Sequence, residues 1–220
     1  MSKTILAAAA SLAALTAAAC AQDAPRSVYL DLGLGVAVPT EDGLEQSGDF
    51  VDFDDARVPF EDEFAFDQDV GAVFRVLLGY EVTPEVAFEV EAKGLGHNVE
   101  QQDGGIGVGA FMANAVYRQD GPGRVTPYVG AGVGYASLDF FDADGDRFSD
   151  DFGGAFAWQV KGGALYELGL RHGVALEGAY LSTSGFEETV EDEFGRTVSE
   201  VDYAAFTATV SYQYRFTGRR

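Results

Sequence analysis

Hydrophobic and polar positions alternate along the chain with a period of two. Between residues 28 and 38, every even position is aliphatic and every odd position is small, polar or aromatic. Successive side chains of a β-strand point to opposite faces, so this pattern predicts a strand with one hydrophobic face. The even positions are Val28, Leu30, Leu32, Leu34, Val36 and Val38.

The same alternation recurs along the chain and predicts an all-β fold of eight strands. Short turns alternate with longer connections, an arrangement that is typical of an eight-stranded antiparallel up-and-down transmembrane β-barrel with its short turns in the periplasm. The expected strands cover residues 27–39, 69–82, 85–97, 106–118, 126–138, 153–168, 174–183 and 200–216. The expected long connections cover residues 40–68, 98–105, 139–152 and 184–199.

Two orientations of the hydrophobic face are compatible with this pattern. A soluble, lipocalin-like barrel would turn that face inward and leave the charged positions on a wet exterior. Its outer surface would then be bare at Gly130, Gly132 and Gly134, and its narrow lumen would have to hold the bulkier face. We therefore predict that the hydrophobic face meets lipid, while small and polar residues fill the lumen.

Aromatic residues at one end of the predicted strands support the membrane orientation. The second, fourth, sixth and eighth strands end at the same side of the barrel, and each carries an outward aromatic residue near that end. Aromatic residues gather at membrane interfaces, so these positions predict a periplasmic aromatic girdle. Its members are Tyr80, Tyr117, Tyr166, Tyr214 and Phe216.

Residues 1–21 have the composition of a secretory signal peptide, and residues 22–220 form the expected barrel domain. Lys3 is followed by an apolar run and by small residues at a cleavage site. Cys20, the only cysteine, either leaves with this peptide or carries a lipid after cleavage at Ala19. A lipobox has Leu three positions before its cysteine, where this chain has Ala17.

Several segments resemble the small eight-stranded outer-membrane β-barrel proteins, the group of the OmpA transmembrane domain, OmpX/Ail and Opa-like surface antigens. The resemblance implies a porin-like barrel in the outer membrane of a Gram-negative bacterium, inserted by the barrel-assembly machinery through a C-terminal aromatic residue. Here Thr217 to Arg220 follow that residue, Phe216. The segments are residues 29–35 (YLDLGLG), 111–117 (FMANAVY), 126–136 (TPYVGAGVGYA), 156–163 (FAWQVKGG) and 212–216 (YQYRF).

Acidic and basic residues at inward positions predict a charge network in the lumen. Buried charges have to be paired and hydrogen-bonded, and both signs are present at comparable depth. The network is either a structural plug or a gate that opens a small pore. Its predicted members are Asp31, Arg75, Glu89, Glu91, Lys93, Lys161 and Glu177.

The formal net charge of −22 argues against nucleic acid as a partner, because phosphates would be repelled. Residues 41–69 are strongly acidic with interleaved Phe residues, which predicts a solvated loop. Alternatively, this loop binds divalent cations near lipopolysaccharide or mediates adhesion. Asp142, Asp144 and Asp146 resemble a calcium-binding run, but the Gly and the final Glu of an EF-hand loop are misplaced, so they are weak metal candidates.

Catalytic candidates are few, because the chain has only two histidines. His172 lies in a predicted periplasmic turn, and His97 near the external end of a strand has Ser182 or Ser184 as a spatial partner at best. We therefore expect a non-enzymatic, monomeric structural and surface-interaction protein without a cofactor, in contact with outer-membrane lipid and lipopolysaccharide. A small gated porin-like channel is the alternative, followed by a lipid A-modifying hydrolase.

Overall fold

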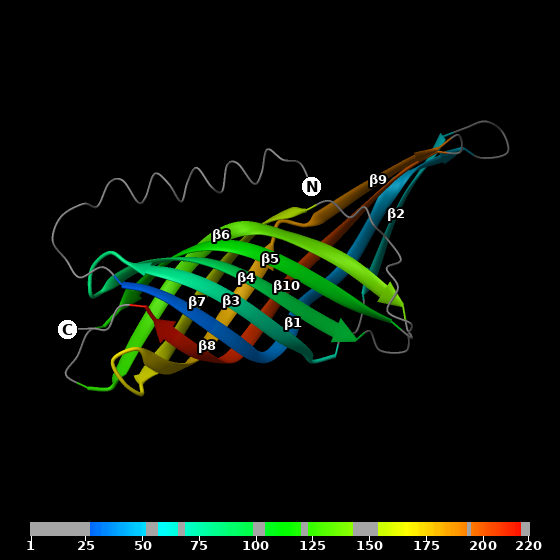
Figure 1. Ribbon diagram of the computed structural model, residues 1–220. Coiled ribbons are helices and arrows are strands. Elements are labelled where there is room, and N and C mark those ends of the chain that lie inside the picture. Colours follow the sequence, from blue (N-terminus) through cyan, green and yellow to red (C-terminus); the bar gives the residue numbers. More distant parts are fainter. Residues whose placement is uncertain are drawn as a thin grey trace.

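Eight of the ten strands close into an antiparallel barrel, which is the fold predicted from the alternation (Figure 1). The computed structural model describes residues 27–51, 57–65, 69–98, 104–119, 123–142, 154–192 and 195–216. Within these ranges, no helix has the length and apolar character needed to span a bilayer. The strands are β1 (Ser27–Val51), β2 (Arg57–Ala65), β3 (Gly71–Glu81), β4 (Val86–Asn98), β5 (Gly104–Arg118), β6 (Val125–Asp142), β7 (Ala155–Glu167), β8 (His172–Thr183), β9 (Phe186–Asp192) and β10 (Gly195–Arg215).

Closure of the barrel depends on β1, which pairs with β3 on one side and with β10 on the other. The remaining barrel strands pair in sequence order from β3 to β8, and β8 pairs with β10. The backbone N–H of Phe216 donates to the carbonyl of Val28 over 2.9 Å, so the first and last described residues lie together. We call this end, where residues 82–85 and 168–171 make tight turns, the short-turn end.

At the opposite, extended end, β1 and β10 continue far beyond the other strands. Their pairing shifts register between Pro39 and Glu41 and then runs to Phe50 opposite Gly195. β2 pairs with this part of β1, and β9 pairs with this part of β10. These four segments form a sheet that leaves the barrel, seen at the upper right of Figure 1, which we call the projecting sheet.

The projecting sheet corrects the prediction that residues 40–68 and 184–199 are loops. Most of the described residues in these ranges are strand instead. The high density of like charges favours solvated loops when each segment is considered alone. Pairing with a distant segment satisfies the backbone N–H and C=O groups of both, and local composition contains no information about that pairing.

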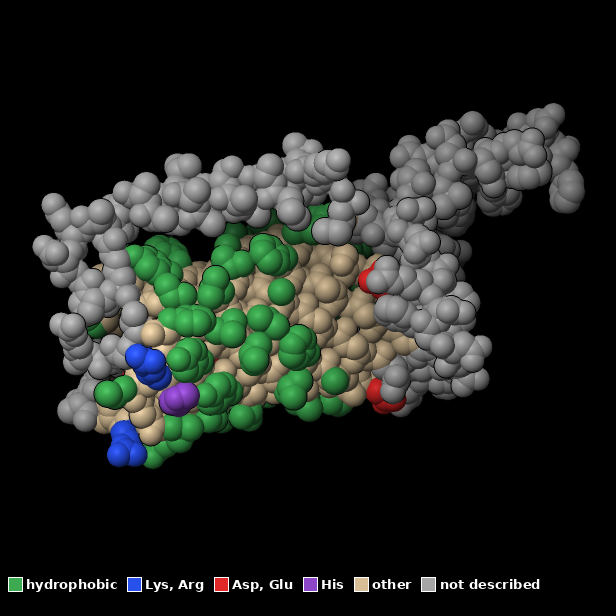
Figure 2. All heavy atoms as spheres, viewed as in Figure 1, with side chains coloured by type: hydrophobic (Ala, Val, Ile, Leu, Met, Phe, Trp, Pro, Cys, Tyr) green, Lys and Arg blue, Asp and Glu red, His purple; other side chains and the backbone are tan. Residues whose placement is uncertain are grey.

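The hydrophobic face points outward, as predicted. The Leu34 side chain on β1 is 67 % exposed, whereas the Asp31 side chain on the opposite face is 2 % exposed. Figure 2 shows hydrophobic side chains over the middle of one face, with basic side chains at the short-turn end and acidic ones at the extended end. A wide, apolar outer surface on a closed barrel is what a transmembrane barrel presents to lipid.

Small and large residues alternate inside the barrel. Gly79 on β3 pairs with Tyr29 on β1, and a side chain added at Gly79 would overlap the Tyr29 ring. Gly33 leaves room in the same way for the Arg75 side chain. These inward glycines give a narrow lumen the space for large polar side chains.

Candidate functional site: the lumen of the barrel

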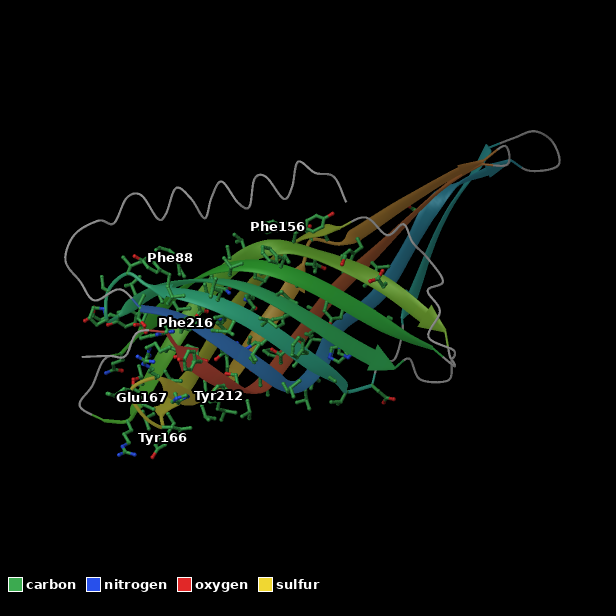
Figure 3. All side chains as sticks on the ribbon, in the orientation of Figure 1. Phe88, Phe156, Tyr166, Glu167, Tyr212 and Phe216 are labelled. Carbon is green, nitrogen blue, oxygen red and sulfur yellow. The ribbon has the colours of Figure 1, made fainter. Side chains whose placement is uncertain are left out.

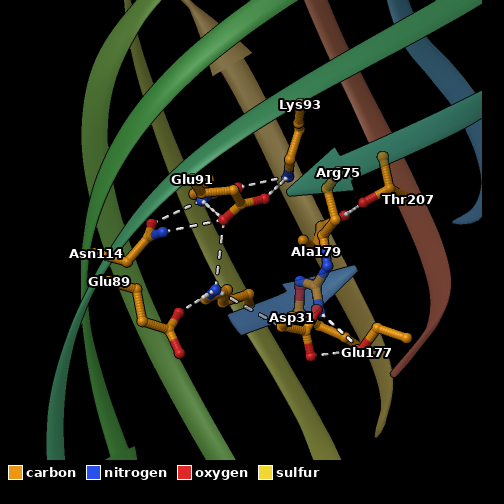
Figure 4. Close-up of polar contacts among 12 residues, drawn as sticks. Asp31, Arg75, Glu89, Glu91, Lys93, Asn114, Glu177, Ala179 and Thr207 are labelled. Carbon is orange, nitrogen blue, oxygen red and sulfur yellow. Dashed lines mark hydrogen bonds and ion pairs between the residues drawn. The ribbon is translucent and has the colours of Figure 1, made fainter. Parts of the chain in front are cut away.

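A network of charged and polar side chains fills the lumen at the short-turn end (Figure 4). Its members lie at inward positions on different strands and are linked across the lumen. The structure brings together all seven charged residues that the sequence pattern selects, none more than 6 % exposed: Asp31, Arg75, Glu89, Glu91, Lys93, Lys161 and Glu177.

The Arg75 guanidinium is the first centre of the network. Its Nη1 donates to Glu177, and its Nη2 donates to Asp31 Oδ1 over 3.1 Å and to Ser211 Oγ over 3.2 Å. The Ser211 hydroxyl in turn donates to Asp31 Oδ2 over 2.8 Å. Arg75 therefore ties β3 to β1, β8 and β10.

Lys161 on β7 is the second centre. Its ammonium lies 2.6 Å from Glu89 Oε2, 3.4 Å from Glu91 Oε2 and 3.7 Å from Glu177 Oε2. Because Glu177 also binds Arg75, the two basic centres share a carboxylate. The network therefore continues across the lumen as a single unit.

Glu91 is fully buried and is surrounded by polar and basic side chains. Its Oε2 accepts hydrogen bonds from Asn114 over 3.0 Å and from Gln159 over 2.9 Å. The Lys93 ammonium lies 3.0 Å from Glu91 Oε1 and donates to Gln159 Oε1 over 2.7 Å. A buried carboxylate is tolerated only with such partners, so these side chains fix the conformation of one another.

A second group of charged residues, which the alternation did not select, lies closer to the short-turn end. Arg118 Nη1 is 2.6 Å from Glu81 Oε1, and Arg215 Nη2 is 3.2 Å from the same oxygen. Arg118 also lies 3.6 Å from Glu89 and stacks over the Tyr29 ring at 4.5 Å. These residues occupy strand ends, where boundaries are uncertain, but their alternation with outward neighbours could have identified them.

Apolar side chains fill the extended half of the lumen. They form one cluster that begins where the charge network ends. The cluster includes Val73, Leu95, Ile106, Val108, Met112, Leu138, Leu181, Phe186 and Tyr203. Charged side chains thus predominate at the short-turn end of the described lumen, where Tyr29, Leu77 and Ala87 form a smaller apolar cluster. Apolar side chains predominate at the extended end, together with the buried polar residues His97, Ser182 and Thr183.

One small cavity lies inside the charge network. It is a cavity of about 10 Å³ whose lining includes Asp31, Arg75, Glu89, Arg118 and Glu177. A volume of roughly 10–15 Å³ corresponds to about one water molecule. This cavity thus has space for an isolated water beside these charges.

A comparison with protein families decides the identity of this barrel. Residues 7–216 match the model of the outer membrane protein beta-barrel domain. The chain belongs to this family. It is an outer-membrane protein embedded in the lipid bilayer, so its short-turn end faces the periplasm and its extended end faces outward.

Solved structures of outer-membrane barrels have the same fold. Neisserial surface protein A is 14 % identical, with a TM-score of 0.57, over 88 % of this chain and 98 % of that chain. OprG from Pseudomonas aeruginosa is 14 % identical, with a TM-score of 0.62, over 87 % and 96 %. AlkL, solved in lipid bilayers, is 18 % identical, with a TM-score of 0.53, over 91 % and 96 %. No curated protein matches the chain with significance.

The aromatic residues selected as a periplasmic girdle lie at the short-turn end. Tyr117, Tyr166 and Phe216 are exposed on the outer surface, and Tyr80 and Tyr214 are half-buried there. Figure 3 shows Tyr166 and Phe216 at this end, together with Tyr212, Phe88 and Glu167. His172 joins these aromatic residues, because its Nδ1 is hydrogen-bonded to the Tyr212 hydroxyl.

The other candidates form no catalytic or metal-binding arrangement among the described residues. His97 Nε2 lies 2.7 Å from the Tyr203 hydroxyl, and its Nδ1 lies 3.2 Å from the Asp69 carbonyl oxygen. The Ser182 hydroxyl donates instead to the backbone carbonyl of Thr183 over 3.5 Å. The described part of the chain contains no group of three or more residues that could hold a metal.

Two of the predicted features, the possible metal-binding run and the signal peptide, fall wholly or partly outside the described residues. Asp144 and Asp146 lie outside them, and only the backbone position of Asp142, at the end of β6, is described. The expected signal peptide, residues 1–21 with Cys20, also lies outside them.

Proposed function

We propose that this protein is a non-enzymatic outer-membrane barrel with a structural and surface-interaction role, and that its lumen does not conduct. The observation that supports this function is the charge network, which spans the lumen from β1 and β3 to β7 and β8. The apolar cluster lies beyond it in the lumen. Ions would have to displace paired charges and then cross an apolar layer.

The paired charges act as a structural plug in this proposal. Removing one partner of a buried ion pair leaves the other charge unpaired and destabilises a protein by about 3–5 kcal/mol. The closed arrangement is therefore strongly preferred over one in which Arg75 or Lys161 swings aside. The small gated channel is the alternative, and the cavity beside Arg75 is the feature that favours it.

Dye release from liposomes separates the plug from the channel. Vesicles loaded with a small fluorescent dye and containing the wild-type barrel should leak no faster than protein-free vesicles. Arg75→Ala and Lys161→Ala test the gate directly. If either side chain is a gate, its removal should open the pore and release the dye. Rapid release from wild-type vesicles would contradict the structural function.

The extended end supplies the surface for interaction. The register places Glu63, Glu45, Glu200 and Glu187 opposite one another on β2, β1, β10 and β9. Like charges directly opposite across a sheet are destabilising, and bound divalent cations would relieve that repulsion. We propose that lipopolysaccharide is a partner of this end and that divalent cations bridge its phosphates to these acidic residues.

Retention of lipopolysaccharide by the purified barrel tests this partner. We expect retention in Mg²⁺ and loss in EDTA, and weaker retention by the double variant Glu45→Gln, Glu200→Gln. Glu85→Gln in a periplasmic turn is the control and should behave as wild type. Cation bridging would be excluded if wild type retained as much lipopolysaccharide in EDTA as in Mg²⁺ and the double variant retained as much as wild type.

A lipid A-modifying hydrolase is the third candidate function. The bonds of His97 to Tyr203 and Asp69, and of Ser182 to Thr183, argue against a nucleophile and base pair there. The mass spectrum of lipid A from cells that express the protein should match that from cells without it. A change in the mass of lipid A by that of one acyl chain would establish that the protein is an enzyme.

Biogenesis follows from the same proposal. We propose that residues 1–21 are removed during export and that the barrel-assembly machinery then inserts a monomer by recognising Phe216. N-terminal sequencing of the outer-membrane form should begin near residue 22. A lipid-modified Cys20 as the first residue would identify a lipoprotein instead.

A further inference from the structure

A groove of about 380 Å³ crosses the outer surface of the barrel over β7, β8 and β10. Its floor is bare because small residues occupy one row of the sheet. Gly162 on β7 pairs with Gly178 on β8, which in turn pairs with Ala208 on β10. Neighbouring outward positions carry larger side chains, so the row forms a depression.

The wall toward the extended end is made by bulky residues of the next outward row. Val160, Tyr180 and Phe206 are paired across the same three strands. The Tyr180 ring lies 4.8 Å from the Phe206 ring and 5.6 Å from the Trp158 ring, both in tilted arrangements. Such ring contacts hold the aromatic side chains in place, so the wall is preformed.

The polar side chains around the groove have partners elsewhere. Lys161 contributes to the lining, but its ammonium binds Glu89 inside the lumen at 2.6 Å. The Thr207 hydroxyl donates to the carbonyl of Ala179 over 3.5 Å. The groove therefore offers an apolar surface, which suits an apolar ligand.

The depth of the groove can be placed from the strand geometry. Gly178 follows His172, at the periplasmic end of β8, by six positions. Six residues of strand span about 20 Å, and a tilt of roughly 40° leaves about 15 Å along the membrane normal. Half of the hydrocarbon core is also about 15 Å thick. The groove thus lies near the depth at which acyl chains end.

We propose that this groove binds one acyl chain of a phospholipid from the periplasmic leaflet. The groove is continuous with the surface that contacts the hydrocarbon, so acyl chains are the molecules that meet it. The aromatic wall closes it toward the external leaflet. Toward the periplasm, the next outward row consists of Ala164, Leu176 and Val210, so the groove is lowest on that side at the small Ala164 of β7. The inference does not depend on whether the lumen conducts.

Trp158 provides a probe, because it is the only tryptophan and its ring lies 5.6 Å from the Tyr180 ring of the wall. The purified barrel would be reconstituted in vesicles of phosphatidylethanolamine and phosphatidylglycerol. A phospholipid brominated near the end of one acyl chain is then mixed in. Bromine quenches tryptophan fluorescence at short range, so a chain whose brominated end lies against the wall quenches the neighbouring Trp158 at low mole fractions, and the quenching saturates early.

Gly178→Leu fills the groove without disturbing the barrel. A Cβ atom at Gly178 meets only the Thr207 carbonyl oxygen, at 3.9 Å. Gly94→Leu is the matched control on a distant, lipid-facing part of β4, where an added Cβ meets nothing within 4 Å. We expect Gly178→Leu to lose the early, saturating quenching and Gly94→Leu to keep it.

Three outcomes would overturn the proposal. One is quenching in wild type that rises only in proportion to the bulk mole fraction of brominated lipid. Another is removal of the quenching by unlabelled lipopolysaccharide at low ratios, which would assign the groove to the external leaflet. The third is a wild-type dimer, lost in Gly178→Leu, which would assign the groove to a second copy of the chain.

Discussion

At the scale of single residues, the lumen is a set of mutually dependent charges. Arg75 holds Glu177 and Asp31, and Lys161 holds Glu89 and Glu91. Each acidic residue is buried, so the basic residue beside it is needed to offset the cost of burying its carboxylate. Glycine supports this arrangement by making room for the large polar side chains.

Arg75→Met should destabilise the barrel by about 3–5 kcal/mol, because Asp31 and Glu177 would remain buried without their cation. Urea unfolding of the reconstituted protein measures this change. The triple variant with Asp31→Asn and Glu177→Gln should regain much of the loss, since the unpaired charges are gone. Arg124→Met, at an exposed turn, is the control and should unfold at the wild-type midpoint. An unchanged midpoint for Arg75→Met would show that the pairs contribute little.

Gly79→Val should also destabilise the barrel, in this case through overcrowding. The added side chain would overlap the Tyr29 ring, and overpacking costs about 1–3 kcal/mol. Gly94→Val adds the same atoms to an open outer position and should leave stability unchanged. The same urea titration compares the two variants, and equal stabilities would refute the packing argument.

At the scale of elements, the barrel and the projecting sheet have different roles. The ring of eight strands closes through the pairing of β1 with β10 between Tyr29 and Pro39, and this part includes the charge network. The projecting sheet begins after the irregularity at Pro39 and Glu41. β2 and β9 form its two edges and pair on one side each.

Removal of the projecting sheet should leave a folded barrel. Short turns would replace residues 43–65 and 187–199, while every pairing within the closed ring is retained. We expect the shortened protein to reach the outer membrane and to keep heat-modifiable migration on a detergent gel. The full-length protein is the reference. Failure of the shortened chain to fold would mean that the projecting sheet is needed to close the barrel.

At the scale of the whole molecule, the sequence alone predicts the ring well and its extension poorly. Alternation places Leu34 outside and Asp31 inside, because a strand with one face toward lipid and the other toward the lumen has a strict period of two. The same alternation predicts that Arg75 and Lys161 face the lumen. Arg118 and Arg215 escape because they stand where strand boundaries are least certain. The projecting sheet was not predicted because its central strands, β1 and β10, are far apart in sequence and all four of its segments are rich in like charges.

The charge distribution of the whole molecule agrees with its orientation. The basic residues of the lumen are paired with acidic ones, whereas most of the other acidic residues that the structure describes lie on strand segments at the extended end. The paired charges inside the lumen contribute to stability, and in the proposed function they also seal it. The proposed function rests on this separation of roles.

Single-channel recording of the wild-type barrel in a planar lipid bilayer tests the central claim most directly. The charge network and the apolar cluster together predict a silent membrane after insertion, which heat-modifiable migration of the recovered protein would verify. Steady, reproducible current steps from the wild-type protein would contradict the claim and establish the channel function instead.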